Sequence, residues 1–394
     1  MSQLLNERWS ETKDALLEGL SGTRRSSMSV CLENTRRYLG ESATAGSTSA
    51  GNIATLNRVI LPVIRRVMPT VIANEIIGVQ PMTGPVAQIH TLRVRYADSG
   101  DQVQAGEEAL SPFKIAAGYS GNNDSQTAPG ADTTAALEGR PGRRMSIQIL
   151  KSPVEAKSRK LSARWTFEAA QDAQAQQGID IEAEIMAALA QEITAEIDQE
   201  ILSSLRRLAS VEETYDQSLV SGTATFVGDE HAALAIQINR VSNLIAQRTR
   251  RGAGNWAVVS NQALTILQSA TTSAFARTTE GTFDAPTNTK FVGTLNGAMR
   301  VYVDAYMTDN TAQDANQVLI GYKGASEADA AAFYCPYIPL MSSGVVLDPA
   351  TFEPVVGFLT RYGYVELTNT ASSLGNAADY LGKVAITTAN VSFK

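Results

Sequence analysis

The chain has 394 residues, 44% of them hydrophobic, and carries a formal net charge of -7 at pH 7. This size and composition predict a folded, soluble protein of two or three structural units and exclude a disordered chain. The acidic balance argues against a general nucleic-acid binder, which normally carries a basic excess, but it leaves room for a surface that merely faces DNA.

The N-terminal region reads as a part separable from the rest. Residues 2–20 predict an amphipathic helix with Trp9 and Leu16 near its apolar face. A second, short helical piece follows, and the small polar residues of 40–52 indicate a flexible linker or extended arm. We therefore treat 1–50 as an N-terminal arm or propeptide-like region.

A rigid joint is predicted between an apolar segment and a strand. Residues 55–77 are interrupted by Pro62 and Pro69, which favours two short helices over one. The stretch GVQPMTGP at 78–85 then places two prolines, which fix φ, beside two glycines, which permit turns that other residues resist. The alternation in VAQIHTLRVRYA at 86–97 indicates a half-buried strand.

A projecting arm and a long helix follow. Residues 98–144 lack periodicity and are rich in Gly, Ser, Asn and Asp, so we expect a hairpin-like arm, with 145–150 as its returning strand. After a polar helix at about 166–177, isoleucine and leucine recur every four residues from Ile181 to Ile201. At ~1.5 Å per residue, this rod of about 28 residues spans roughly 42 Å.

The second half predicts an α+β unit. Residues 220–345 alternate helices and strands, with a helix from Asp229 to about Arg251 followed by the strand NWAVVS and the helix NQALTILQSA. The strand-like PVVGFLTRYGYVEL near the C-terminus would return to the first unit. Two interleaved α+β units are the predicted architecture.

Candidates for chemistry are few. His90 and His231 lack nearby partners typical of catalysis, and GAG at 252–254 is too short for a nucleotide fingerprint. Cys31 and Cys335 form no metal-binding or disulfide pattern and fit a reducing compartment. No apolar run reaches the ~18 residues of a membrane helix, and no secretory signal is present.

The long helix carries the one cluster of acids. A metal pair among them is an alternative, but no Glu-x-x-His accompanies them, and Asp304 elsewhere adds a single acid. We therefore expect a solvated or subunit-facing side and predict no catalytic, cofactor-binding or metal-binding residue. The acids are Glu182, Glu184, Glu192, Glu196, Asp198 and Glu200.

The arm, the projecting loop and the rod bury little within one subunit, which favours oligomer contacts that supply the missing burial. Long stretches then resemble the major capsid protein of T-even-type tailed phages: RRVMPTVIANEIIGVQPMTGPVAQIHTLRVRY, SRKLSARWTFEAAQDAQAQQGIDIEAEI, GYKGASEADAAAFYCPYIPL and DPATFEPVVGFLTRYG. The joint and signature residues of this resemblance are Arg65, Arg66, Pro69, Gly78, Pro81, Gly84, Pro85, Tyr322, Pro336 and Pro339.

The resemblance implies the HK97-like capsid fold. Its expected parts are an N-terminal arm and first peripheral-domain segment at 51–97, an extended loop at 98–150, a peripheral domain with a long spine helix at 151–219, an axial domain at 220–345 and a C-terminal return to the peripheral domain at 346–394. This family carries a large inserted domain near the extended loop, and only about fifty residues stand there here, so we expect that insertion to be absent or vestigial.

The implied function is structural. Hexamers and pentamers would form an icosahedral head around double-stranded DNA held without sequence specificity, assembled in the host bacterial cytoplasm. Implied partners are a scaffold protein, a portal, a prohead protease and a decoration protein. Two alternatives remain open, a pentamer-only vertex protein and an encapsulin-like cellular shell. Family proteases cut after Leu/Ile-x-Glu, so Glu41 is a candidate propeptide cleavage site, although the same pattern recurs at Glu7 and Glu18.

Overall fold

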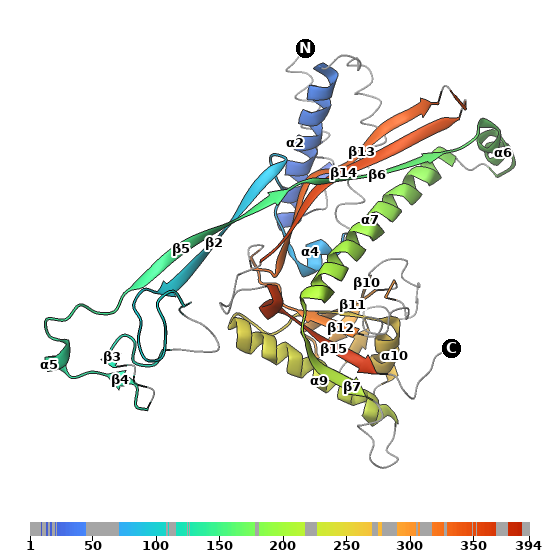
Figure 1. Ribbon diagram of the computed structural model, residues 1–394. Helices are drawn as coiled ribbons and strands as arrows, with labels where there is room; N and C mark the ends of the chain where they lie inside the picture. The colour runs from blue at the N-terminus through green and yellow to red at the C-terminus, as the bar shows by residue number, and fades with distance from the viewer. Residues whose placement is uncertain are drawn as a thin grey trace.

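Figure 1 shows the computed structural model of the chain. It describes residues 9, 13–14, 16–17, 20, 22–44, 71–107, 109, 116–123, 125, 127–177, 181–216, 227–269, 275–277, 290–304, 306–307, 317–326, 329–348, 350–351, 353–367 and 377–387. The predicted helices interrupted by Pro62 and Pro69 lie mostly outside these residues, as do Arg65 and Arg66. Of that segment, only the short helix α4 (Ala73–Ile76) is described.

A four-stranded sheet forms the upper part of the molecule (Figure 1). Its order is β1-β13-β14-β6, and β1 pairs parallel to β13 while the other neighbours are antiparallel. The helix α2 packs against β13, and α7 packs against β6. The elements are α2 (Gly22–Thr44), β1 (Gly78–Val79), β6 (Lys157–Arg164), α7 (Ile181–Leu208), β13 (Ala332–Leu347) and β14 (Pro354–Glu366).

A seven-stranded mixed sheet forms the lower part, in the order β7-β15-β12-β8-β11-β10-β9 (Figure 1). The helix α9 crosses it, and α10 packs beside α9. The strands are β7 (Val211–Asp216), β8 (Trp256–Val259), β9 (Phe275–Arg277), β10 (Lys290–Leu295), β11 (Met299–Val303), β12 (Gln317–Gly321) and β15 (Leu381–Thr387), with helices α9 (Val227–Thr249), α10 (Asn261–Ser269) and η2 (Ala377–Tyr380). The α+β class is therefore confirmed.

The boundaries of the predicted units need two corrections. Residues 332–345, expected within the 220–345 unit, belong to β13 in the four-stranded sheet. The chain does return to the first unit as β14, but β15 then re-enters the seven-stranded sheet between β7 and β12. The physical reason is burial: β15 supplies Val384 and Ile386 to the core of that sheet, so its apolar side is satisfied only there.

A two-stranded hairpin projects from the body (Figure 1). The strands β2 (Val86–Tyr96) and β5 (Met145–Glu155) pair antiparallel over their whole length, which confirms the predicted projecting arm and its returning strand. The tip, where the sequence shows no periodicity, holds a small core in which the ring centroids of Tyr96 and Tyr119 lie 4.6 Å apart. It carries the short elements β3 (Asn122–Asn123), β4 (Gly130–Ala131) and α5 (Thr134–Leu137).

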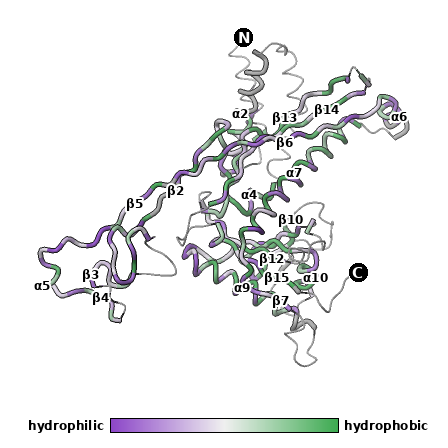
Figure 2. Tube along the Cα trace, in the orientation of Figure 1, coloured by the Kyte–Doolittle hydropathy of each residue, from purple (hydrophilic) through white to green (hydrophobic). Residues whose placement is uncertain are grey.

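The helix α7 runs between the two sheets, as the periodicity predicted (Figure 1). A second, polar helix, α6 (Phe167–Gln177), precedes it. The hydrophobic face of α7, green in Figure 2, is buried in the main core together with residues of both sheets. Its buried apolar side chains include Met186, Leu189, Ile193, Ile197, Ile201 and Leu205.

A buried ion pair fixes the lower end of α7 to the seven-stranded sheet. Arg206 pairs with Asp304, which directly follows β11 and is fully buried. Gln199 on the same helix donates to Asp304 Oδ1 at 2.7 Å, and the backbone N–H of Tyr306 donates to it at 3.0 Å. The carboxylate is therefore hydrogen-bonded on both oxygens, as a buried charge requires.

A second polar cluster fixes the middle of α7 to the four-stranded sheet. Arg159 of β6 donates to Glu196 at 2.8 Å and to Glu200 at 2.6 Å. Tyr362 of β14 donates to Glu200 and accepts from Arg159 at 2.6 Å. Burial alone would raise the pKa of Glu200, but the hydrogen bonds from Tyr362 and Arg159 outweigh it and hold that pKa below its usual value.

The N-terminal region is part of the core in this structure. The expected linker at 40–52 is wrong for its first residues, because α2 continues to Thr44. Met28, Cys31 and Leu32 of α2 are at most 2% exposed within the main core, and burial raises the pKa of the Cys31 thiol to about 12. Because this apolar face stabilises both α2 and the sheet beneath it, the segment is not a free arm in the full-length chain.

The joint at 78–85 is held by backbone hydrogen bonds, not by special turns at its glycines. Neither Gly78 nor Gly84 has a positive φ, so the predicted need for special turns is wrong. The segment instead extends the parallel pairing of β1, since Gln80 donates to Tyr334 O and Met82 donates to Pro336 O, each at 3.0 Å. Pro85 O then accepts from Ala156 N at 2.9 Å and closes the base of the hairpin.

Removing the arginine of the buried pair tests how α7 is held. Arg206→Met leaves Asp304 charged, buried and short of a partner, so we expect a loss of about 3–5 kcal/mol in the free energy of unfolding. Arg207→Met is the matched control, because Arg207 is 75% exposed and its ion pair with Glu366 is long, at 3.6 Å, which makes the expected loss ~1 kcal/mol or less. Urea titration of both variants measures the difference; equal losses would contradict this account.

Candidate assembly surfaces

An exposed apolar strip runs along the projecting hairpin. Directly opposed residues of an antiparallel pair share a face, and the register sets Val94 against Ile147 and Tyr96 against Met145. The tip core covers Tyr96, but Ile147 is 68% exposed, Ile149 60% and Met145 54%. Three large apolar side chains on one face of one strand therefore contact solvent in the single chain.

The hairpin has too little support to be an independent structure. A two-stranded ribbon is marginally stable in water, and covering one face is the usual remedy. Toward the body, the residues of β2 and β5 alternate: Val154 and Ala87 pack in a small core with Met82, whereas Val86 points outward and is 58% exposed. The apolar strip thus lies on the part of the ribbon that the chain itself leaves uncovered.

A second exposed apolar group lies at the far end of the four-stranded sheet. Val345, Val346 and Leu347 of β13 are 43–57% exposed where β13 turns into β14 (Figure 1). Phe167 at the start of α6 is 48% exposed. Exposed apolar side chains gathered in this way are typical of surfaces that meet another protein.

The signature residues from the sequence are brought together only in part. Pro81 lies within the segment that pairs with β13, where Met82 N donates to the carbonyl of Pro336, and Pro85 accepts from Ala156 at the base of the hairpin. The pairing of β13 with β14 shifts register after Pro336 and again around Pro339, as expected where a strand contains proline. Tyr322 lies apart, at the end of β12, where it stacks on Tyr380.

The residues considered for chemistry are scattered. His90 lies on an exposed part of β2, and His231 Nδ1 on α9 lies 2.6 Å from Ser269 Oγ. Glu196 and Glu200 are engaged by Arg159, and Glu192 is exposed. Within the described ranges, no three His, Cys, Asp or Glu side chains are grouped as a metal site, and no helix there is long and apolar enough to cross a membrane.

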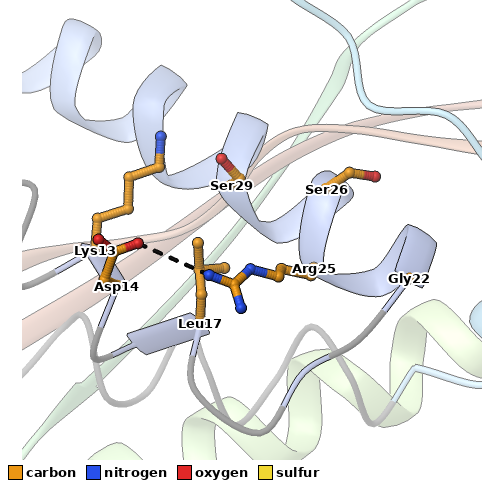
Figure 3. Close-up of a pocket in the computed structure, with 7 residues that line it drawn as sticks. All are labelled: Lys13, Asp14, Leu17, Gly22, Arg25, Ser26 and Ser29. Carbon is orange, nitrogen blue, oxygen red and sulfur yellow. Dashed lines mark ion pairs between the residues drawn. The ribbon is translucent and has the colours of Figure 1, made fainter.

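A cleft of about 440 Å³ lies between α2 and the helical residues before it (Figure 3). Asp14 pairs with Arg25 at 3.9 Å across this cleft, and Leu17 is buried at its edge. Lys13 and Trp9 both donate to Glu33 of α2, at 3.2 and 3.3 Å. These contacts show that the described residues between 9 and 17 lie against α2.

The exposed strip is the functional feature that sequence reasoning missed. Its signal was present, because the alternation in MSIQIL predicted the strand correctly. Alternation tells which residues share a face, but it does not tell whether the same chain covers that face. Only the separation of the hairpin from both sheets shows that it does not (Figure 1).

The comparisons with known proteins agree on one family. The model of the family described as major capsid protein Gp23 matches residues 53–386. Major capsid proteins of Salmonella phage ViI and Enterobacteria phage T4 are 31% and 29% identical to the chain; each alignment covers 83% of this chain, with 80% and 78% of those proteins. That of Vibrio phage KVP40 is 28% identical over 85% of this chain and 81% of its own length.

Two of the solved structures similar to the chain are described as phage capsids. One described as the capsid of Myoviridae phage XM1 has a TM-score of 0.43 at 9% identity, covering 79% of this chain and 90% of that one. The asymmetric unit of the bacteriophage PhiM1 mature capsid has a TM-score of 0.45 at 13% identity, covering 78% and 84%.

Stability measurements test whether the strip belongs to the core of the single chain. Because Ile147 and Ile149 are exposed, Ile147→Ser and Ile149→Ser should each change the free energy of unfolding by no more than about 0.5 kcal/mol. Val154→Ala on the same strand removes two methyl groups from a side chain only 2% exposed, and should cost about 2 kcal/mol. Thermal or urea unfolding of the unassembled chain distinguishes them, and a large loss for either isoleucine would contradict the assignment.

Proposed function

We propose an assembly role for each projecting part of the fold, from the premise that this chain belongs to the Gp23 family of major capsid proteins. The chain is a structural protein of the tailed-phage capsid shell, and the expected HK97-like fold class follows from this membership. In the finer proposal, copies of the chain form hexamers and pentamers of an icosahedral head assembled in the host cytoplasm.

The hairpin is the proposed clamp between neighbouring copies. The observation that carries this role is the apolar strip of Met145, Ile147 and Ile149, which the chain exposes on a ribbon too thin to be stable alone. Burying a large aliphatic side chain contributes about 1.5–3 kcal/mol. Burial of this strip by a second copy of the chain would therefore stabilise the contact between the two copies.

The remaining parts receive roles from the family plan. The seven-stranded sheet corresponds to the axial domain, the four-stranded sheet with α7 to the peripheral domain, and the hairpin to the extended loop. Packaged double-stranded DNA would face the inner surface without sequence recognition. A scaffold protein, a portal, a prohead protease and a decoration protein are the proposed partners. No observation favours the vertex-protein or encapsulin-like alternative over the major capsid role.

Charge placed on the apolar strip tests the clamp. We expect the double variant Ile147→Asp/Ile149→Asp to remain a folded chain yet to lose shell formation by tenfold or more, because each ~1.4 kcal/mol lost at a contact is a factor of about ten. Gln148→Asp adds one negative charge, half of that added by the double variant, to the opposite face of β5 and should assemble normally. Sedimentation and electron microscopy measure shell yield, and circular dichroism checks folding. Normal shells from the double variant would refute the clamp.

Processing after Glu41 is the proposed fate of the N-terminal region. Glu41 lies within the helix α2, and proteolysis favours exposed, locally unfolded backbone, so the end of α2 must unwind before a protease reaches it. The expected result is that chains from mature heads have the intact mass of residues 42–394, and that Glu41→Gln chains keep their full length. A full-length mass in wild-type mature heads would exclude this cleavage.

A further inference from the structure

One buried backbone group connects the N-terminal segment to α7. Val71, Ile72 and Ala73 at the start of α4 are 0–3% exposed. The N–H of Ile72 precedes the helical hydrogen bonds of α4 and donates to Asp198 Oδ1 at 2.9 Å. A buried N–H without a partner is costly, so Asp198 is the anchor that lets this segment pass beneath α7.

The anchor is chemically unusual. Asp198 is 2% exposed, and among the described residues its Oδ2 has no hydrogen-bond partner. Within the part of the chain that the structure describes, no ion pair joins a cation to Asp198, and Arg206 of the same helix pairs with Asp304. The titratable groups that interact electrostatically with Asp198 from the packed elements are Asp304 after β11 and Tyr334 of β13; Tyr334 in turn interacts with the Cys31 thiol of α2.

The charged form of this carboxyl is therefore disfavoured. Burial raises the pKa of Asp198 to about 7; the hydrogen bond from Ile72 opposes the shift, and the nearby charge of Asp304 adds to it. Its ordinary value is 3.8. Because the folded chain binds the proton more tightly than the unfolded chain, this site favours folding most below about pH 4, and that contribution is lost as pH rises to about 7.

We propose that Asp198 is a proton-operated anchor: while it is neutral the crossing of α4 and α7 stays closed, and once it is ionised the cost of its buried charge favours opening of that crossing. The position of Asp198 and Ile72 in the chain lets the anchor affect neighbouring elements. Residue 72 lies six residues before β1, the strand that leads through the joint into the hairpin. A change at this crossing therefore alters how firmly both the N-terminal segment and the base of the hairpin are held.

Hydrogen exchange at the anchor is the direct test. Amide exchange is followed by mass spectrometry on the unassembled full-length chain between pH 5.5 and 8.5, for a peptide covering 71–77. After correction for the intrinsic rate, we expect exchange at Ile72 in the wild type to accelerate by up to roughly tenfold per pH unit as the pH rises to about 7, and to level off above that pH. Asp198→Asn keeps the accepting oxygen without the charge and should exchange slowly at every pH.

The control is another acid on the same helix. Glu192→Gln neutralises an exposed carboxylate of α7 and should reproduce the wild-type profile. The proposal is overturned if Asp198→Asn keeps the wild-type pH dependence or if Glu192→Gln abolishes it. A wild-type profile that follows the intrinsic rate alone also overturns it, and this measurement needs no variant to fold. Because no shell is formed in the experiment, its outcome is separate from that of the clamp.

Discussion

The structure depends on one long helix that must satisfy three neighbours at once. The apolar face of α7 lies in a core shared by both sheets and the N-terminal helices, and polar side chains fix it at separate heights. Arg206 engages Asp304 beside the seven-stranded sheet, Glu200 engages Arg159 and Tyr362 of the four-stranded sheet, and Asp198 holds Ile72. Because both sheets and the N-terminal segment are attached to the same helix, the sheets keep fixed positions while the extensions project.

The hairpin, in contrast, is left largely uncovered by the rest of the chain. Most of the buried apolar side chains lie in the cores of the two sheets and around α7. Among the described residues, the ribbon β2–β5 packs in small buried clusters at its base and tip. For a monomer, the exposed Ile147 and Ile149 would be a liability for aggregation. For a shell subunit the same strip is useful, because a neighbour of defined geometry can bury it. This relation connects the fold to the structural role of the family.

The N-terminal region connects folding to any later processing. In the full-length chain, Met28, Cys31 and Leu32 fill the main core against β13, and Asn34 donates to the carbonyls of Met82 and Tyr337 at 2.7 and 3.1 Å. Loss of α2 would therefore uncover apolar surface of the sheet and remove one hydrogen bond from the joint and one from β13. A cleaved subunit would differ from its precursor in the core as well as in length.

Sequence by itself determined the elements whose patterns are local: the period of α7, the alternation of β2 and β5, the α+β class and, through long matching stretches, the family. The sequence did not determine which elements and side chains contact one another. Glu192 and Asp198 are acids on one helix, yet only the packing of α4 makes Asp198 a buried anchor. Likewise, β15 and β13 joined sheets that the chain order did not suggest, and Ile147 proved exposed. Periodicity fixes which side chains share a face, whereas burial depends on what the rest of the chain brings against it.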